Sequence, residues 1–199
     1  MSSDERAPQS NFLPTDTRAV ILVSLMVSLI SAVVLAWLGQ PFWCECGRWQ
    51  LASWDIWSAH NSQHPVDPYT FTHVLHGILF CGFLWMIGSR FSVIVRYSTA
   101  MVAEGLWEVL ENTPLVIDRY REATISLDYY GDSIANSVFD ILACGLGFLV
   151  AQFLGLRWSV AVFVLVEAVL AWAIRDNLTL NVIMLVCPLE SIKQWQMPP

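Results

Sequence analysis

Residues 19–38 read AVILVSLMVSLISAVVLAWL, a run without a charged side chain. At a rise of about 1.5 Å per residue, a helix of this length covers the roughly 30 Å hydrocarbon core of a bilayer. A cleavable signal peptide has a shorter apolar core followed by small residues in an A-x-A pattern, which the end of this run, Ala36-Trp37-Leu38-Gly39, does not have. We therefore predict a retained membrane anchor.

Four further apolar stretches have lengths suited to crossing a membrane. The second and third are joined only by Ser89-Arg90, and the fourth and fifth only by residues 155–157, so each pair is predicted to form an antiparallel helical hairpin. Residues 178–187 are apolar but too short to cross, which predicts a re-entrant or interfacial segment. The sequence thus predicts an all-α fold, an integral membrane bundle of about five transmembrane helices. The four further stretches are residues 71–88, 91–110, 134–154 and 158–174.

Composition supports a single membrane domain. The chain is 56% hydrophobic and 14% charged, whereas soluble domains carry about 25% charged residues. We expect a disordered tail over residues 1–18, one transmembrane domain over 19–187 and a C-terminal tail over 188–199. The ten Lys and Arg residues are scattered singly, so nucleic acid is not an expected partner. The expected partners are the lipid bilayer and either other membrane proteins or further copies of the chain.

Ionisable residues lie inside or beside the predicted spans, where a charge at the bilayer centre costs about 2.5–3.5 kcal/mol. The alternating direction of the spans brings these residues to the face that carries the two long loops, between the first and second spans and between the third and fourth. We call this the loop face. Helical spacing places the residues of each span on one side. The predicted polar cluster comprises His73, His76, Glu104, Glu108, Asp132, Asn136 and Asp140.

The residue types in this cluster indicate a candidate enzyme site. Imidazole and carboxylate together suit zinc or a harder divalent ion, so His73, His76, Glu104 and Glu108 are candidate metal ligands. Arg119 and Arg121 are candidate substrate-binding residues, because guanidinium matches phosphate geometry. The corresponding function is a membrane-embedded, metal-dependent hydrolase or transferase acting on a lipid-linked or envelope substrate. Since no H-E-x-x-H, G-x-S-x-G or P-loop motif is present, the reaction class stays open.

Other interpretations compete with catalysis, and the sequence favours a structural or accessory protein whose buried polar cluster holds the bundle together. A proton pathway through Glu104, Asp140 and Glu167 is a third hypothesis. Asp132 could cap the fourth helix with help from Ser133, and an Arg96 salt bridge could account for Glu104.

The first long loop holds two cysteines and two histidines. Cys44 and Cys46 form a C-E-C pair in which a mutual disulfide would be strained, leaving metal binding or free thiols open. His60 and His64 are interpreted as solvated.

Motifs recur along most of the chain from about residue 40 onward. They are Asn61-Ser62-Gln63-His64 followed by Asp67, Tyr69-Thr70, His73-x-x-His76-Gly77, Glu104-x-x-Trp107-Glu108-x-x-Glu111-Asn112, Arg119-Tyr120-Arg121, Tyr130-Gly131-Asp132-Ser133-x-x-Asn136-Ser137-x-x-Asp140 and Arg175-Asp176-Asn177-Leu178-Thr179-Leu180-Asn181. Taken together, these motifs resemble those of a family of uncharacterised multi-pass inner-membrane proteins from alphaproteobacteria. The resemblance implies a bacterial cell-membrane protein and supplies no activity.

A fainter similarity is to VanZ-like membrane proteins, through Glu104/Glu108, Arg119/Arg121 and Asp132/Asn136 with Gly145.

The orientation in the membrane is predicted from the shortest links. Arg90 and Arg157 lie in these links and favour a cytoplasmic N-terminus.

Overall fold

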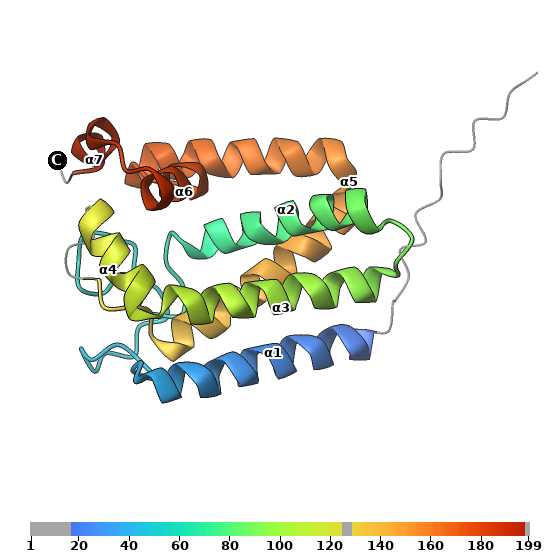
Figure 1. The fold of residues 1–199 in the computed structure, drawn as a ribbon, viewed down its shortest axis with the longest axis horizontal. Coiled ribbons are helices and arrows are strands. Elements are labelled where there is room, and N and C mark those ends of the chain that lie inside the picture. Colours follow the sequence, from blue (N-terminus) through green and yellow to red (C-terminus); the bar gives the residue numbers. More distant parts are fainter. Residues whose placement is uncertain (1–16, 125–128, 198–199) are drawn as a thin grey trace, which may run out of the picture.

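A computed structural model describes residues 17–124 and 129–197, and within these ranges the protein is helical with no strand (Figure 1). The predicted all-α fold is therefore confirmed. The predicted N-terminal tail lies outside the described residues except for Thr17 and Arg18, which begin the first helix. The helices are α1 (Thr17–Leu38), α2 (Thr70–Gly88), α3 (Val93–Glu111), α4 (Pro114–Ala123), α5 (Ile134–Ile174), α6 (Leu178–Val186) and α7 (Glu190–Gln196).

Three helices, α1, α2 and α5, are long and apolar enough to cross a membrane. The count of five spans is not confirmed by length and composition, because α3 carries Arg96 and three glutamates and because the last two predicted stretches fall within the 41-residue α5. Gly155 interrupts α5 with φ 72° and ψ 173°, a backbone conformation that glycine adopts readily. At this break the two arms of α5 turn back on each other (Figure 1).

The first helix, α1, is packed as a membrane helix is, with small polar residues inward and large apolar residues outward. Leu25 and Leu29 are exposed. On the opposite face, Ser24 Oγ lies 2.7 Å from the Tyr97 hydroxyl oxygen of α3, and Ser31 Oγ donates to the Gly105 carbonyl at 3.5 Å. The buried residues of α1 recur every three or four positions and are Ser24, Ser28, Ser31 and Leu35.

The centre of the bundle is the contact between α2 and the first arm of α5, where two glycines let the backbones approach closely. A Cβ atom on Gly77 would overlap the Cys144 carbonyl oxygen, and one on Gly147 would overlap the Val74 carbonyl oxygen. Buried apolar side chains from α2, α3 and α5 fill the remaining space around this contact. This close contact sets the distance between the polar residues that the two helices carry.

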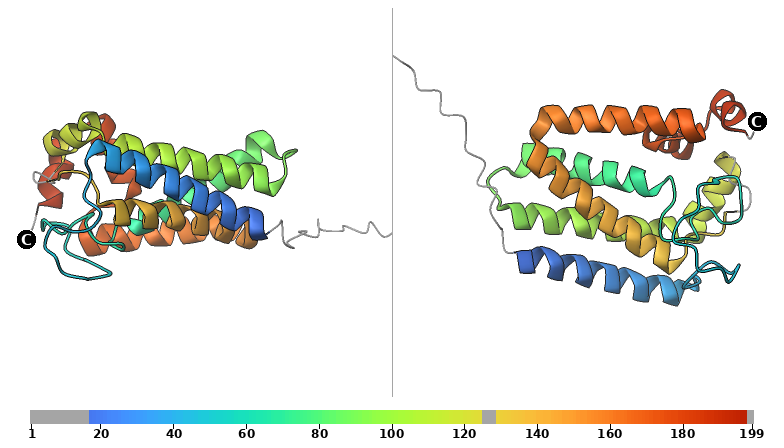
Figure 2. Two further views of the ribbon diagram at one scale, coloured as in Figure 1. Left: turned by 90° about the horizontal axis from the view of Figure 1, so that it is seen from below. Right: turned by 180° about the vertical axis from the view of Figure 1, so that it is seen from behind.

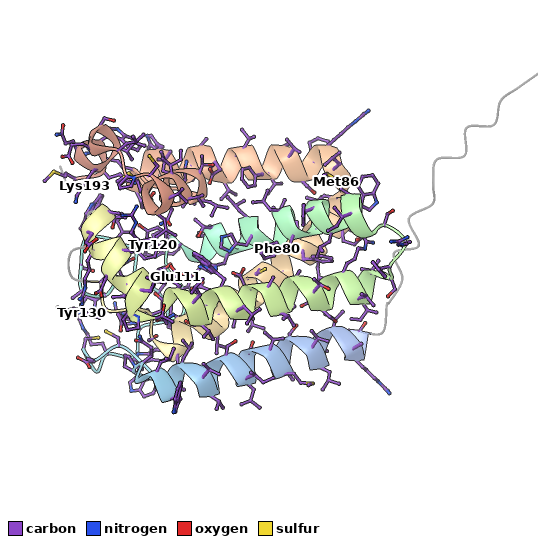
Figure 3. All side chains as sticks on the ribbon, in the orientation of Figure 1. Phe80, Met86, Glu111, Tyr120, Tyr130 and Lys193 are labelled. Atoms are coloured by element: carbon purple, nitrogen blue, oxygen red, sulfur yellow. The ribbon has the colours of Figure 1, made fainter. Side chains whose placement is uncertain are left out.

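The short helices and both long loops gather at one end of the long helices, the loop face of the sequence analysis (Figures 1 and 2). Met86 marks the opposite end of α2 (Figure 3). The C-terminal segment, predicted as a tail, includes α7. Gln196 fixes α7 to the loop face, because its backbone carbonyl accepts a hydrogen bond from Trp57 Nε1 at 3.2 Å and its side-chain amide donates to Asp176 at 2.9 Å.

Candidate functional site

A cavity of about 350 Å³ lies near the loop face between α2, α3, α5 and α6. Its lining combines apolar and polar side chains. Phe80 lies deeper along α2, whereas Glu111 and Tyr120 lie nearer the loop face (Figure 3). The apolar lining is Phe80, Ala103, Trp107, Val182 and Leu185, and the polar lining includes His73, His76, Glu104, Glu111, Asp132, Asn136, Asp140 and Asp176.

Two imidazoles of α2 share one carboxylate of α3. His73 and His76 lie one helical turn apart, so both rings project from the same side of α2. His73 Nδ1 lies 2.6 Å from Glu104 Oε1, and His76 Nδ1 lies 3.1 Å and 3.0 Å from the two oxygens of Glu104. The Glu104 side chain is fully buried. Arg96 is not its partner, since its Nε and Nη1 atoms are buried without a hydrogen bond.

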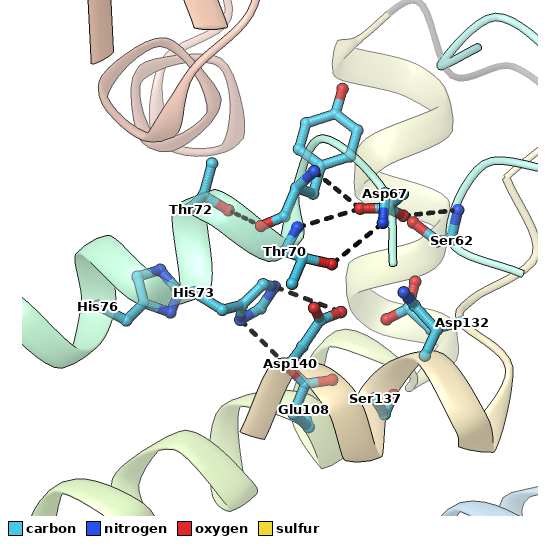
Figure 4. A network of polar contacts seen from close by, with 12 residues as sticks. Ser62, Asp67, Thr70, Thr72, His73, His76, Glu108, Asp132, Ser137 and Asp140 are labelled. Atoms are coloured by element: carbon cyan, nitrogen blue, oxygen red, sulfur yellow. Dashed lines mark hydrogen bonds and ion pairs between the residues drawn. The ribbon is translucent and has the colours of Figure 1, made fainter. Parts of the chain in front are cut away.

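Two further carboxylates approach the ring of His73 (Figure 4). Glu108 Oε1 lies 3.2 Å from His73 Nδ1, and Asp140 Oδ2 lies 3.9 Å from His73 Nε2. Neither contact is a hydrogen bond, and both oxygens of Glu108 and Oδ1 of Asp140 are buried with no hydrogen-bond partner. Burying a carboxylate without partners costs several kcal/mol unless a proton or a cation compensates it. The cluster therefore has the residue types of a cation site, and its buried negative charge is not compensated.

Ligand atoms come within metal-binding range in two overlapping groups, each spanning at most 4.8 Å. One group is His73, His76 and Glu104, and the other is His73, Glu108 and Asp140. Three of the four predicted metal ligands are thus in the first group, and Glu108 is in the second. Their predicted role as ligands stays a prediction.

Asp132 and Asn136 line the same cavity but are held by other contacts. Asp132 does not cap α5: the Ser133 side chain accepts the hydrogen bond from the Asn136 backbone N–H. Asp132 instead accepts from Asn112 Nδ2 at 3.1 Å and from the Tyr129 hydroxyl at 2.9 Å. Burial raises the pKa of Asp132 above its usual range. Asn136 Nδ2 donates to the His64 carbonyl at 2.9 Å, which joins the cavity wall to the first loop.

The two candidate substrate-binding arginines do not line this cavity. Arg119 Nε donates to the Leu185 carbonyl at 2.8 Å, and Arg121 Nε donates to the Tyr129 carbonyl at 2.6 Å. The Arg121 guanidinium also stacks over the Tyr130 ring. These contacts hold α6 and the segment before α5 against α4, and a role in substrate binding stays a prediction.

Glu167, expected to be a deep functional acid, has a structural role. Its carboxylate accepts hydrogen bonds from the backbone N–H groups of Leu178 and Thr179 at 2.9 Å and 3.1 Å. A carboxylate at this position satisfies the free N–H groups at the start of α6 and complements the helix dipole. Glu167 is absent from the cavity lining, so a relay through it with Glu104 and Asp140 has no support here.

Sequence reasoning gave no role to three polar residues that help to form the site. Asp67 accepts hydrogen bonds from the backbone N–H groups of Ser62, Tyr69 and Thr70, which shapes the loop just before α2 (Figure 4). The Tyr69 hydroxyl donates to Asp176 Oδ2 at 2.9 Å, and both residues line the cavity. All three lie within or beside the quoted motifs, and that adjacency was the available signal.

The buried Asp176 predicts a pH dependence of stability. Burial raises the pKa of this carboxyl from 3.8 to about 6, so the folded state binds its proton more tightly than the unfolded chain does. The resulting stabilisation is present below the unfolded pKa and is lost as pH rises through about 6, an effect of up to about 3 kcal/mol. We expect the Asp176→Asn variant, which keeps an acceptor for Gln196, to lose this dependence. Thermal unfolding of both proteins between about pH 4 and about pH 7 measures it, and parallel curves would contradict it.

The class of protein that these features define is a helical protein with three candidate membrane-spanning helices, a close glycine contact and a buried imidazole–carboxylate pocket at one end. The chain belongs to the family described as protein of unknown function (DUF2585), whose model matches residues 35–198.

Relatives from several alphaproteobacteria cover most of the chain. A UPF0314 protein of Rhizobium meliloti is 48% identical over 178 residues, which is 88% of this chain and 89% of the relative. A UPF0314 protein of Paracoccus denitrificans is 45% identical over 173 residues, covering 87% and 90%. One from Sphingopyxis alaskensis is 44% identical over 179 residues, covering 88% and 93%. No solved structure matches the chain. The predicted resemblance to an uncharacterised alphaproteobacterial family is confirmed.

Proposed function

We propose that this protein is a membrane-embedded, metal-dependent hydrolase or transferase that acts on a lipid-linked substrate. The observation that carries the proposal is the convergence of two imidazoles and three buried carboxylates beside an amphipathic cavity, with three carboxylate oxygens lacking a hydrogen-bond partner. A cluster that only held helices together would pair its polar atoms, because unpaired buried groups cost stability. This arrangement favours the enzyme hypothesis over the accessory role that the sequence favoured.

Each residue has an assigned task in this proposal. His73, His76, Glu104 and Glu108 hold one divalent ion, zinc by the mixture of nitrogen and oxygen donors. Such an ion supplies a Lewis acid for a phosphoryl or acyl oxygen. Asp140, whose Oδ1 has no partner, accepts the proton of the attacking hydroxyl or water. The apolar wall near Phe80 and Trp107 receives the hydrocarbon part of the substrate.

The proposal includes a location in the bacterial cell membrane, with α3 and the two arms of α5 each crossing the bilayer beside α1 and α2. Five spans place the N-terminus and the loop face on opposite sides. A cytoplasmic N-terminus is supported by Arg90 and Arg157 in the two short connections at the far end from the loop face. The cavity then opens toward the outer leaflet. Other membrane proteins or a second copy of the chain are proposed partners, and nucleic acid is not.

Metal content and lipid composition together test this function. We expect protein purified in detergent to retain zinc, and the His76→Ala and Glu104→Gln variants each to lose one equivalent. In a bacterial strain lacking its own copy of the gene, we expect the wild-type chain to restore the envelope lipid profile and the Asp140→Asn variant to fail while keeping its metal. The exposed Glu122→Gln serves as the matched control, with wild-type metal and lipids.

Two outcomes would reject the enzyme proposal. The first is wild-type protein that retains no metal at the pocket. The second is an Asp140→Asn variant that restores the lipid profile as well as wild type does. A pocket variant that unfolds instead of losing turnover would point to the accessory role.

A further inference from the structure

The loop between α1 and α2 contains a second cluster of metal-binding side chains, separate from the pocket. Cys44, Cys46, His60 and His64 place one ligand atom each within 4.8 Å of one another. An isolated β-bridge between Ala52 and Val66 closes the part of the loop that carries His60 and His64. We propose that these four residues form a structural zinc site that fixes the loop over the bundle. This inference does not rest on the proposed function of the pocket.

The burial and hydrogen bonding of His64 indicate that one of its ring nitrogens binds a metal ion. The residue is fully buried, in contrast to the solvated position expected from sequence. Its Nδ1 lies 2.8 Å from the Gln50 carbonyl oxygen, a contact that only an Nδ1–H donor can make. This tautomer leaves a lone pair on Nε2, which is buried without any partner. A histidine that donates one ring N–H to a backbone carbonyl and directs its other nitrogen inward has the arrangement of a zinc ligand.

The cysteines complete a donor set that suits zinc. Cys44 Sγ lies 3.4 Å from His60 Nδ1 and accepts a hydrogen bond from the Cys46 backbone N–H at 3.4 Å. Two thiolates and two imidazoles neutralise a divalent ion and favour tetrahedral zinc. The histidines have the H-x3-H spacing of structural zinc sites, while the cysteines are one residue closer together than usual. Both cysteines are free, as the strained geometry of a C-x-C disulfide favours.

Metal can enter the loop site from the surface of the protein. The four ligands of this site also lie beside the wall of the pocket between α2, α3, α5 and α6. Cys44, Cys46 and His60 line a cavity of about 670 Å³ at the loop face. His60 Nε2 accepts a hydrogen bond at 3.1 Å from the exposed Arg48, whose side chain turns to solvent when the ring binds metal through Nδ1.

The segment between the two histidines contacts Ser133, the N-cap residue of α5. Ser62, in the left-handed region with φ 57°, accepts a hydrogen bond from the Ser133 backbone N–H at 2.9 Å and lines the pocket. Such a backbone conformation costs a non-glycine residue energy and persists only where its surroundings hold it. One zinc ion bound by His60 and His64, which flank Ser62 in the sequence, would supply that restraint.

Cobalt titration of the full-length, detergent-purified protein tests the site. The protein is reduced, stripped with a chelator and titrated with Co(II), and the thiolate-to-cobalt charge-transfer absorption is recorded. We expect this band to saturate at one equivalent and to bleach on addition of Zn(II). It should weaken in the Cys46→Ser variant, which replaces an exposed side chain and keeps the Cys44 thiolate, and disappear in the Cys44→Ser/Cys46→Ser double variant. The control is Cys187→Ser, another exposed free cysteine, which should keep the band.

The same titration separates this site from the pocket. Glu104→Gln should leave the charge-transfer band unchanged, because the pocket contains no thiolate ligand. A band that is absent from reduced wild type, or that survives in the Cys44→Ser/Cys46→Ser double variant, would overturn the zinc site. If Glu104→Gln binds less cobalt while its charge-transfer band is unchanged, the lost cobalt was bound in the pocket, and the result leaves the loop site unaffected.

Discussion

Replacing Gly77 by alanine should separate α2 from α5 and unfold the protein at a markedly lower temperature. The added Cβ would overlap the Cys144 carbonyl oxygen and lie 2.6 Å from the Phe148 backbone nitrogen, and backbone atoms cannot rotate away as side chains do. Overpacking in a core costs about 1–3 kcal/mol, and a clash with backbone should reach or exceed the upper value. Thermal unfolding in detergent, followed through the fluorescence of the ten tryptophans, measures the loss.

The matched control lies on the same helix. Gly82 has no atom within 4 Å of the position of an added Cβ, so Gly82→Ala should leave stability unchanged or raise it by about 1 kcal/mol through helix propensity. Gly147→Ala should reproduce the Gly77 effect from the other side of the contact, because its Cβ would overlap the Val74 carbonyl oxygen. Equal melting temperatures for Gly77→Ala and Gly82→Ala would show that the α2–α5 contact is looser than described.

Replacing Glu108 by glutamine should have opposite effects with and without metal. The Glu108 side chain is fully buried, and neither of its oxygens has a hydrogen-bond partner. Removing its charge reduces the electrostatic repulsion within a cluster of buried carboxylates that also contains Glu104 and Asp140. We expect chelator-treated Glu108→Gln to be more stable than chelator-treated wild type by about 2 kcal/mol. With zinc bound, the order reverses, because a ligand that binds only the folded state stabilises it and the variant binds that ligand more weakly.

Melting temperatures of both proteins with zinc and with chelator test this reversal. At this chain length, about 2 kcal/mol corresponds to a difference of about 4–8 °C. The control is Glu122→Gln, an exposed carboxylate on α4, which should shift stability by less than about 0.5 kcal/mol in either condition. A Glu108→Gln variant that is less stable in both conditions would support a purely structural cluster.

The positions of the long helices follow from the sequence, because an uninterrupted apolar run has few alternatives to a membrane-length helix. The short helices were harder to predict. Residues 114–123, which form α4, carry four charged side chains. Residues 190–196, which form α7, are held by tertiary contacts that include those of Gln196 with Trp57 and Asp176. Such helices depend on tertiary contacts, which periodicity does not reveal.

The candidate site was partly predictable for a similar reason. Helical spacing places His73 beside His76 and Glu104 beside Glu108, and alternating helix direction brings the two pairs to one end. The fate of Glu167 could not be predicted, since its carboxylate caps α6 only because α6 folds back against the end of α5. The contribution of Asp67 also depends on the folded path of the first loop.

The most direct test of the pocket is zinc X-ray absorption on the Cys44→Ser/Cys46→Ser double variant, in which the loop site can no longer supply thiolates. We expect one zinc per chain, bound by two imidazole nitrogens and by carboxylate oxygens, with no sulfur neighbour. A Glu104→Gln variant of this background should lose this zinc. Zinc-free protein, or a zinc whose coordination is unchanged by Glu104→Gln, would contradict a metal centre at His73, His76, Glu104 and Glu108.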